Sequence, residues 1–344
     1  MRVLIIKTSS LGDVIHTLPA LMDAVKQVPN IQFDWVVEES FQEIPAWHSR
    51  VNKVIPIALR RWRKDWFSAL KSGEMSAFLH SLRMSSYDYI IDAQGLLKSG
   101  VIALLAKGKR GGFSWAAAKE PLTSLIYHDK TYASWKEHAI LRARALFAGS
   151  LKYELPIDKP NYGLDLGRVK KDSTEEIPCP YLIFLHGTTW KNKHWPEAYW
   201  VELARKVVTL GFQIRLFWGN PQERERAVRI AQAVGGVIVM PKLNLKEIAK
   251  TLAFAKAVVA VDTGLGHLTA ALGIPCLSLY GPSDVVHSGT MGDQQFHLTV
   301  DYSCSPCRSR QCTHRDAKKM AAPCFSSLPP DKVWAQLRLI LSRE

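Results

Sequence analysis

The chain has 344 residues, of which 47% are apolar and 22% charged, as in ordinary soluble globular proteins. This length exceeds a typical single hydrophobic core, so we expect two domains. No apolar stretch is long enough for a signal peptide or a transmembrane helix, which predicts a cytoplasmic protein that can still touch a membrane surface. The net charge of +14 favours an anionic partner: nucleic acid, lipid headgroups or a phosphorylated small molecule.

The first half of the chain alternates apolar runs with amphipathic stretches. Residues 3–6 predict a buried strand, followed by a loop of hydroxyl side chains and then a helix with apolar residues at helical spacing from Val14. Further strands are expected at residues 33–37, 54–58 and 89–91, and helices at residues 68–82, 96–106 and 138–151. Residues 113–132 are expected to be irregular, since glycines and a proline interrupt them. This rhythm favours a parallel, doubly wound sheet.

Residues 152–179 carry several prolines and little periodicity, which predicts a linker. The alternation then restarts. Strands are expected at residues 181–185, 213–217, 236–240, 257–261 and 275–280. Helices are expected from Pro196 and at residues 223–234, 245–255, 266–272 and 330–341. The second half therefore predicts another doubly wound domain, with a cleft between the two halves.

Open α/β sheets bind ligands at the carboxyl ends of their strands, so the loops there are the candidate sites. The first half supplies Ser9, Ser10, Gly12 and Asp13, and the second half supplies Thr188, Thr189, Lys193, Glu223, Asp262, Thr263, Gly264 and His267. The residues before the helix at 266–272 can hold a phosphate with backbone amides and a hydroxyl. Lys193 can neutralise a diphosphate, and Glu223 can accept hydrogen bonds from a ribose. Each residue also fits an ordinary cap or turn.

Asp13 lies near the start of a helix, where an acid is commonly a cap or a partner of the helix dipole. In an enzyme that moves a sugar from a diphosphate to an alcohol, it would instead take the proton of the hydroxyl. The chain lacks the P-loop and dinucleotide-binding glycine motifs and an Asp-x-Asp pair at a strand end of its first half. A diphosphate leaving group would then depend on Lys193 and helix ends, without Mg²⁺.

Arg60, Arg61, Arg63 and Lys64 place four cations in five positions, beside Trp62 and Trp66. A second basic cluster comprises Lys107, Lys109 and Arg110. We interpret the first as a site for an anionic acceptor; a solvated surface is the alternative. Tryptophan beside arginine also suits a membrane interface or a ligand rim. No helix-turn-helix, RRM or KH signature accompanies the charge, which disfavours nucleic acid.

The chain has six cysteines. Cys179 and Cys276 are expected to be small core residues. The other four follow the spacing C-x2-C-x4-C-x11-C, at Cys304, Cys307, Cys312 and Cys324. In a cytosolic chain this spacing favours a metal over disulfides, although it is not a standard zinc-ribbon spacing. A reduced or incidental cluster is the alternative, and we assign no metal site.

Three segments, KTSSLGDVIHTLPAL, HGTTWKNKHWP and VDTGLGHLTAALG, resemble the bacterial lipopolysaccharide heptosyltransferases of glycosyltransferase family 9. Within that family, WVVEESFQEIPAWH, LRRWRK, IDAQGLLKS and AAAKEPLTSLIY are most similar to heptosyltransferase I. The segment CSPCRSRQC, with the later Cys324, looks more like the tail of heptosyltransferase II.

The resemblance implies a GT-B fold of two Rossmann-like domains. Residues 1–165 would bind the acceptor, residues 166–328 ADP-heptose, and a helix in 329–344 would pack back toward the N-terminal domain. It implies inverting transfer of L-glycero-D-manno-heptose from ADP-L-glycero-β-D-manno-heptose to the first Kdo of Kdo₂-lipid A, in inner-core lipopolysaccharide biosynthesis. No metal or cofactor would be required, and the enzyme would work on the cytoplasmic face of the inner membrane. Heptosyltransferase II, a protein heptosyltransferase and, more distantly, a nucleic-acid-binding protein remain alternatives.

The resemblance also implies roles for individual residues. Asp13 matches the catalytic base. Donor-binding positions match Ser10, Gly12, Thr188, Thr189, Lys193, Glu223, Leu243, Asp262, Thr263, Gly264 and His267, with Leu243 at the adenine. Acceptor-binding positions match Arg60, Arg61, Arg63, Lys64 and Lys119. The position of Lys119 is often Arg in relatives, and lysine does not make the same bidentate contact.

Overall fold

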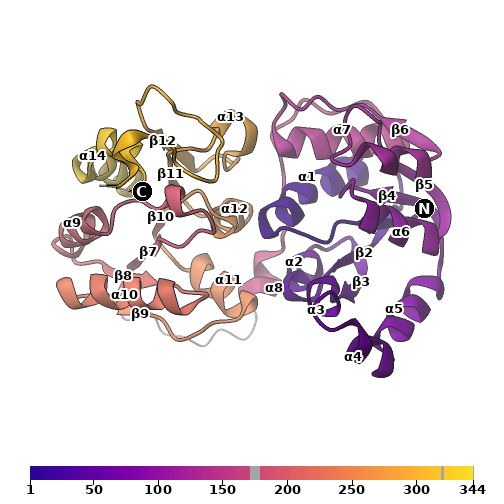
Figure 1. Cartoon of the computed structure of the whole chain (residues 1–344), viewed down its shortest axis with the longest axis horizontal. Coiled ribbons are helices and arrows are strands. Elements are labelled where there is room, and N and C mark those ends of the chain that lie inside the picture. Colours follow the sequence, from indigo (N-terminus) through magenta and orange to yellow (C-terminus); the bar gives the residue numbers. More distant parts are fainter. Residues whose placement is uncertain (171–178, 319–320, 344) are drawn as a thin grey trace. The chain divides into compact units, whose positions relative to one another are not determined.

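A computed structural model describes residues 1–170, 179–318 and 321–343. The chain divides into two compact units, Met1–Asp165 and Leu166–Glu344. Each unit is a parallel sheet covered by helices (Figure 1). Within the described residues, every helix is too short or too polar to span a lipid bilayer.

The first unit is built on six parallel strands in the order β3-β2-β1-β4-β5-β6. The strands are β1 (Arg2–Ile6), β2 (Gln32–Glu38), β3 (Val51–Ile57), β4 (Ser86–Asp92), β5 (Lys107–Phe113) and β6 (Asp129–Thr131). Strand β1 is central, and its side chains from Val3 to Ile6 are fully buried because helices cover both faces of the sheet. This explains why the chain begins with an uninterrupted apolar run.

Helices α1 (Leu11–Gln27) and α7 (Ala139–Leu151) pack against each other on one face of this sheet. A buried ion pair joins them, since the Arg144 guanidinium donates to both carboxylate oxygens of Asp23 at 2.6 and 3.1 Å. The opposite face shares one apolar core with α3 (Leu59–Trp62), α4 (Trp66–Lys71), α5 (Glu74–Arg83) and α6 (Leu97–Leu105). The remaining short elements are η1 (Glu39–Phe41), α2 (Glu43–Ala46) and η2 (Pro121–Ile126).

Two predictions for this unit were wrong. The helix expected at residues 68–82 is broken into α4 and α5 at Gly73, whose φ of +76° suits glycine. Residues 113–132 were expected to be irregular, but they contain the last residue of β5 and all of β6. Strand β5 is rich in lysine and glycine, so it has no apolar run. It needs glycine because a Cβ at Gly111 would lie 2.5 Å from the Tyr89 hydroxyl.

The second unit has six parallel strands in the order β12-β11-β10-β7-β8-β9. They are β7 (Tyr181–Leu185), β8 (Gln213–Leu216), β9 (Val237–Val239), β10 (Ala257–Val261), β11 (Cys276–Tyr280) and β12 (Gln295–Thr299). Counted along the chain within each unit, both sheets have the order 3-2-1-4-5-6. Strand β12 was not predicted, because it lies half-buried at the edge and mixes polar with apolar residues.

The helices of this unit are α8 (Leu166–Lys170), α9 (Glu197–Val208), α10 (Pro221–Ala233), α11 (Leu245–Ala253), α12 (Gly264–Ala271), α13 (Val285–Ser288) and α14 (Pro330–Leu341), with η3 (Lys191–Lys193), η4 (Arg315–Lys318) and η5 (Pro323–Ser327). Helices α9, α10 and α14 share one apolar core with the sheet. Helix α12 packs on β10 and β11 and contacts α11. The predicted linker, residues 152–179, contains α8, and its residues 171–178 lie outside the described residues.

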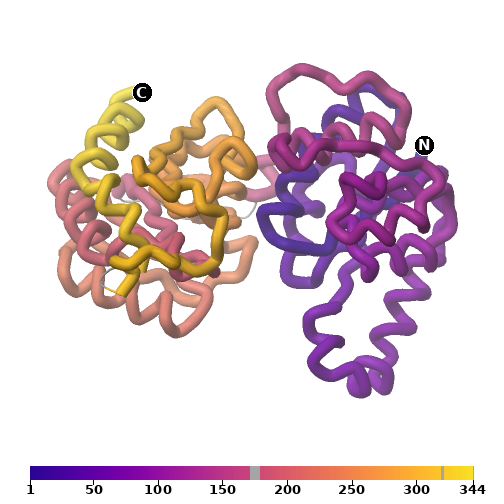
Figure 2. The backbone as a smooth tube through the Cα atoms, turned by 45° about the horizontal axis from the view of Figure 1, so that its top comes forward, coloured from indigo at the N-terminus to yellow at the C-terminus, as the bar shows by residue number. Residues whose placement is uncertain are grey.

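Helix α14 was expected to pack back toward the N-terminal domain. Its apolar residues Val333, Leu337 and Ile340 are buried in the core of the second unit, and the helix packs against α9. Packing toward the N-terminal domain stays a prediction. Figure 2 shows the C-terminal segment, in yellow, running alongside the rest of its own unit. The predicted bounds of this helix, residues 330–341, are confirmed.

Candidate active site

Asp13 lies in the first turn of α1, directly after the loop that follows β1. Its Oδ2 atom accepts hydrogen bonds from the amide and the hydroxyl of Ser10, both at 2.8 Å. Ser10 and Asp13 thus form a capping box, so the acid does stabilise the helix start as its position suggested. The neighbouring Gly12 lies in the same turn, and its backbone is buried there.

Lys7, directly after β1, is a charge partner of Asp13 and was not among the predicted site residues. Its Nζ atom donates to the carbonyl of Ala93 at 2.8 Å. Burial would raise the pKa of Asp13, but the Lys7 ammonium and the two Ser10 hydrogen bonds outweigh it and hold the pKa below its usual value. Asp13 is therefore a carboxylate at neutral pH and is able to accept a proton.

The loop after β4 fixes the loop that precedes Asp13. Gln94 accepts hydrogen bonds from the amides of Thr8 and Ser9 through its Oε1 atom, at 3.0 and 3.1 Å. Gln94 is held in turn by Asp92, whose Oδ1 accepts from its amide at 2.9 Å. Strands β1 and β4 are neighbours that lead into helices on opposite faces of the sheet, so a crevice opens between their loops. Asp13 lies at this crevice.

In the second unit, the corresponding crevice lies between β7 and β10. The Nζ atom of Lys193 is 2.5 Å from Oδ2 of Asp262, and these side chains are only 15% and 10% exposed. The hydroxyl of Thr188 donates to the backbone carbonyl of Asp262 at 2.9 Å. The loop after β7 therefore contributes a hydroxyl and an ammonium group, and both contact Asp262 in the loop after β10. Thr189 follows, exposed, in the loop after β7.

Glu223 brings the loop after β8 to the same edge of the sheet. It lies in the first turn of α10, and its Oε2 atom accepts from the amide of Gly219 at 2.7 Å. Its carboxyl group also lies against Gly187, where a Cβ would be 2.8 Å from the Glu223 carboxyl carbon. Glycine at position 187 therefore leaves room for the Glu223 carboxyl group in this position. The loop after β9, which carries half-buried Leu243, completes this edge.

Thr263 is the N-cap residue of α12, and Gly264 is its first residue. The unpaired amides at such a helix start attract anions. His267 lies one turn further along and is buried. The structure therefore brings the predicted donor-side residues of the second unit to the carboxyl edge of one sheet, at the ends of β7, β8, β9 and β10. The other two predicted donor-side residues, Ser10 and Gly12, lie at the start of α1 in the first unit.

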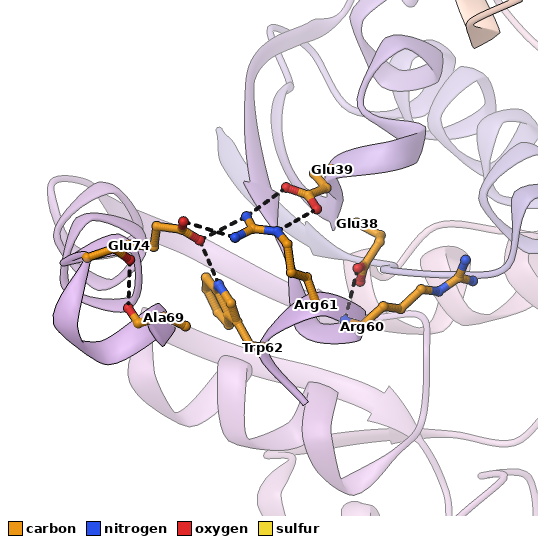
Figure 3. Close-up of polar contacts among 8 residues, drawn as sticks. Glu38, Glu39, Arg60, Arg61, Trp62, Ala69 and Glu74 are labelled. Carbon is orange, nitrogen blue, oxygen red and sulfur yellow. Dashed lines mark hydrogen bonds and ion pairs between the residues drawn. The ribbon is translucent and has the colours of Figure 1, made fainter. Parts of the chain in front are cut away.

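The four cations of the basic cluster have different environments, and Figure 3 shows two of them, Arg60 and Arg61. The guanidinium of Arg61 donates to Glu74 at 2.9 Å and to Glu39 at 3.1 and 3.3 Å, and these hydrogen bonds raise its pKa. The guanidinium of Arg60 lies 5.1 Å from the centre of the Phe41 ring. The side chains of Arg63 and Lys64 are exposed. Arg61 is thus held by two acids, whereas Arg63 and Lys64 face the solvent.

The two tryptophans of this cluster also differ. Trp62 is buried, and its ring nitrogen donates to Glu74 at 2.9 Å, so it belongs to the core and not to a rim (Figure 3). Trp66 is exposed and lies against Phe67, with ring centres 3.8 Å apart. Trp66 and Phe67 belong to α4, which projects together with α5 at the periphery of the first unit (Figures 1 and 2).

Glu38 connects this cluster to the loop of Asp13. Its amide donates to the carbonyl of Thr8 at 3.1 Å, and its carboxylate accepts from the amide of Arg60 at 3.1 Å. Lys119 approaches from another direction: it is exposed, its backbone lies beside Gly95, and its charge lowers the pKa of Asp13. The basic cluster is therefore linked to the loop of Asp13 through Glu38, and Lys119 acts on Asp13 through its charge.

The four spaced cysteines Cys304, Cys307, Cys312 and Cys324 line one small cavity, together with His314, and all are free thiols. As these side chains stand, the described residues contain no group of three or more His, Cys, Asp or Glu side chains arranged to hold a metal ion. Cys276 is a core residue, and burial raises the pKa of its thiol to about 12. Of the second basic cluster on β5, Lys109 pairs with Asp129 at 2.9 Å.

Comparison with known proteins identifies the family that has this architecture. Residues 75–318 match the family model of glycosyltransferase family 9 (heptosyltransferase). The chain belongs to this family. The heptosyltransferase is 49% identical to lipopolysaccharide heptosyltransferase 1 of Pseudomonas aeruginosa, over 99% of this chain and 98% of that protein. It is also 49% identical to lipopolysaccharide heptosyltransferase 1 of Escherichia coli K12, over 86% of this chain and 92% of that protein.

Solved structures of relatives confirm the predicted fold class. The solved structure of E. coli heptosyltransferase WaaC with ADP covers 99% of this chain, and this chain covers 100% of it, with a TM-score of 0.86 and 43% identity. The present heptosyltransferase is therefore an α/β enzyme of the GT-B class, with two parallel six-stranded sheets. The resemblance inferred from short segments is confirmed over almost the whole chain.

Proposed function

We propose that this heptosyltransferase moves L-glycero-D-manno-heptose from ADP-L-glycero-β-D-manno-heptose to the first Kdo of Kdo₂-lipid A, with inversion and without a metal ion. One observation carries the choice of acceptor. Identity is 49% to the heptosyltransferase 1 of P. aeruginosa but only 24% to the heptosyltransferase 2 of Salmonella typhimurium, although both alignments are long. The donor is supported by 43% identical structures of the E. coli relative with ADP and with ADP-2-deoxy-2-fluoro heptose.

In this proposal Asp13 is the catalytic base. Its carboxylate takes the proton of the acceptor hydroxyl as the hydroxyl oxygen bonds to the anomeric carbon of the heptose. The bond from that carbon to the diphosphate breaks at the same time, and its electron pair leaves with ADP. Attack from the side opposite the leaving group inverts the anomeric centre. The low pKa of Asp13 supports this role, because the base must be ionised before the reaction.

The second unit, in the same proposal, stabilises the leaving group. The ammonium of Lys193 and the amides at the start of α12 offer positive charge to the diphosphate as its negative charge grows. Asp262 holds Lys193 in place through the 2.5 Å contact. Glu223 is proposed to accept from the ribose hydroxyls and Leu243 to contact the adenine. These groups replace the charge that a metal ion supplies in other sugar-nucleotide enzymes.

The acceptor is tested directly by supplying the purified enzyme with ADP-heptose and either Kdo₂-lipid A or a core that already carries one heptose. Transfer to Kdo₂-lipid A alone is expected, and mass spectrometry of the product shows one added heptose. Transfer only to the heptosylated core would overturn the proposed acceptor. Transfer to a polypeptide in place of either glycolipid would instead identify a protein heptosyltransferase.

Chelation of divalent cations is expected to leave the transfer rate unchanged, because Lys193 and the α12 start supply the positive charge at the diphosphate. The rate is measured after dialysis against EDTA and again after Mg²⁺ is added back. Elemental analysis of the same sample shows whether the cysteine cluster retains a metal through the dialysis. A rate that falls on chelation and returns with Mg²⁺ would contradict the metal-independent mechanism.

Reversing the two solvent-facing cations, with Arg63→Glu and Lys64→Glu together, is expected to raise KM for Kdo₂-lipid A by roughly tenfold or more, because each cation near an anionic lipid contributes about 1 kcal/mol. KM for ADP-heptose should not change. The matched variant is Arg61→Gln, which removes a cation already held by Glu39 and Glu74. This variant should lower thermal stability and leave KM for the acceptor nearly unchanged. Equal effects of the two variants on acceptor KM would contradict this distinction.

A further inference from the structure

Helix α6 exposes an apolar stripe that no part of its own unit covers. Leu97, Val101 and Leu104 recur every three or four residues and are 45%, 51% and 51% exposed. The other side of the helix, with Ile102 and Ala103, is buried in the core beneath the sheet. Burying one side of a surface helix is ordinary; exposing three large apolar side chains on the other side is not.

The 3-10 helix η2 extends this stripe into a wider surface. It packs closely on α6, since a Cβ at Gly100 would lie only 2.6 Å from Cδ1 of Ile126. The amide of Leu97 also donates to the Glu120 carboxylate, at 2.6 Å, which fixes the start of α6 to the segment that leads into η2. Leu122 and Leu125 of η2 are exposed as well. We call these five residues, Leu97, Val101, Leu104, Leu122 and Leu125, the α6–η2 surface.

The charges around the α6–η2 surface are mostly positive. Residues 93–119 contain five cations and no acidic residue. Lys98, Lys107 and Lys119 are exposed, whereas Lys109 is paired with Asp129. Glu120 directs its carboxylate to the Leu97 amide. Apolar side chains flanked by lysines fit the boundary of an anionic lipid bilayer, where leucines enter the acyl region and ammonium groups bind the headgroups.

The α6–η2 surface is also continuous with the crevice of Asp13. Helix α6 begins directly after Gln94 and Gly95, and Gln94 holds the Thr8 and Ser9 amides that lead to Asp13. From the side of η2, the amide of Glu120 donates to the carbonyl of Gly95 at 3.1 Å. Helix α6 and the segment that leads into η2 are therefore both attached to the loop of Gln94 and Gly95, which holds the residues before Asp13.

We propose that the α6–η2 surface docks the enzyme on an anionic lipid bilayer, so that a membrane-embedded glycolipid presents its sugar at Asp13 without leaving the membrane. Presentation of the glycolipid at Asp13 rests on the proposed function, because it assumes a lipid-anchored acceptor. Docking on the bilayer does not, since the apolar stripe and its lysines are independent of the reaction. The proposed partner is a lipid with an anionic headgroup, such as phosphatidylglycerol.

Co-sedimentation with vesicles tests the docking surface. The full-length enzyme is expected to bind phosphatidylglycerol vesicles, to bind phosphatidylcholine vesicles much more weakly, and to release as salt is raised. The double variant Leu97→Ser/Leu104→Ser should weaken binding to phosphatidylglycerol at least roughly tenfold, since two leucines leave the acyl boundary. The matched control Leu210→Ser/Leu339→Ser changes two comparably exposed leucines of the second unit and should bind as the unchanged enzyme does.

A separate variant tests the charges. Lys98→Gln with Lys107→Gln should weaken binding by about fivefold for each lysine removed, with a smaller dependence on salt. Unchanged binding by the double leucine variant, with its melting temperature intact, would overturn the proposal. Equal binding to both kinds of vesicle would overturn the anionic partner. A dimer in solution that the double leucine variant abolishes, without loss of vesicle binding, would assign the surface to a second copy of the chain.

Activity assays separate this inference from the proposed function. The double leucine variant should keep the full rate on a water-soluble Kdo acceptor without acyl chains, and should lose rate only on acceptor embedded in vesicles. If the double leucine variant kept the rate of the unchanged enzyme on both acceptors, the coupling of docking to catalysis would be overturned. Failure of the unchanged enzyme to transfer heptose to any acceptor, with vesicle binding retained, would overturn the proposed function and leave the docking surface supported.

Discussion

Replacing Asp13 with asparagine is expected to lower kcat by about 10²- to 10⁴-fold, the usual contribution of a general base, while the affinity for ADP-heptose stays nearly unchanged. The amide oxygen of asparagine can still accept the hydrogen bonds that Ser10 donates at 2.8 Å, so the start of α1 keeps its cap. What the variant loses is the negative charge that takes the proton. Steady-state kinetics gives kcat, and calorimetric titration with ADP gives the donor-side affinity.

The matched control for Asp13 is Glu247→Gln, because Glu247 holds the same position in the capping box of α11. Its effect on kcat should be within about twofold, since a lost surface interaction is worth only tenths of a kcal/mol. A second readout is the pH profile. The pKa of Asp13 is held below its usual value, so kcat/KM should fall only as the solution becomes strongly acidic. Lost donor affinity with normal turnover of bound donor would instead make Asp13 a structural residue.

Lys193→Gln is expected to lower kcat by about 10²- to 10³-fold and to weaken ADP binding, because the leaving diphosphate loses its cation. The substitution also leaves the Asp262 carboxylate, only 10% exposed, without its ion-pair partner. Leaving a buried charge unpaired costs about 3–5 kcal/mol, so the melting temperature should fall as well. Kinetics, ADP titration and thermal unfolding measure the three effects.

Two further variants separate these causes. The double variant Lys193→Gln/Asp262→Asn removes both charges, so it should regain most of the lost stability but not the lost turnover. Arg229→Gln breaks an exposed pair with Glu197, whose atoms are 2.8 Å apart, and should change neither property measurably. Normal kcat and normal ADP affinity in Lys193→Gln would contradict the proposed role of this lysine.

The sequence predicts most of this fold because buried parallel strands are continuous apolar runs. Strands such as β7 and β10 are fully buried, so nothing polar interrupts them. The elements that were missed lack this property: β5 is built from lysine and glycine, and β12 lies half-buried at an edge. The break at Gly73 was also missed, because the apolar periodicity on its two sides continues without a visible change.

The candidate site was predictable in part for a related reason. Hydroxyl, glycine and charged residues directly after an apolar run mark the carboxyl end of a strand, which is how Asp13 and Asp262 were selected. Pairing between distant segments has no such local mark. Arg61 finds Glu39 and Glu74, which lie 22 and 13 residues away, and the four cations of its cluster look alike until those partners are known. Lys7 became relevant only through its proximity to Asp13.

The repeated strand order 3-2-1-4-5-6 has a consequence for engineering this enzyme. Each sheet offers one crevice beside its first strand, and each unit is stabilised by a core of its own. Under the proposed function, nucleotide choice depends on the loops of the second unit, including Leu243, and acceptor choice on the loops of the first. A library that varies the loop after β9 therefore searches for new donors while the catalytic base stays untouched, and the two specificities can be evolved one at a time.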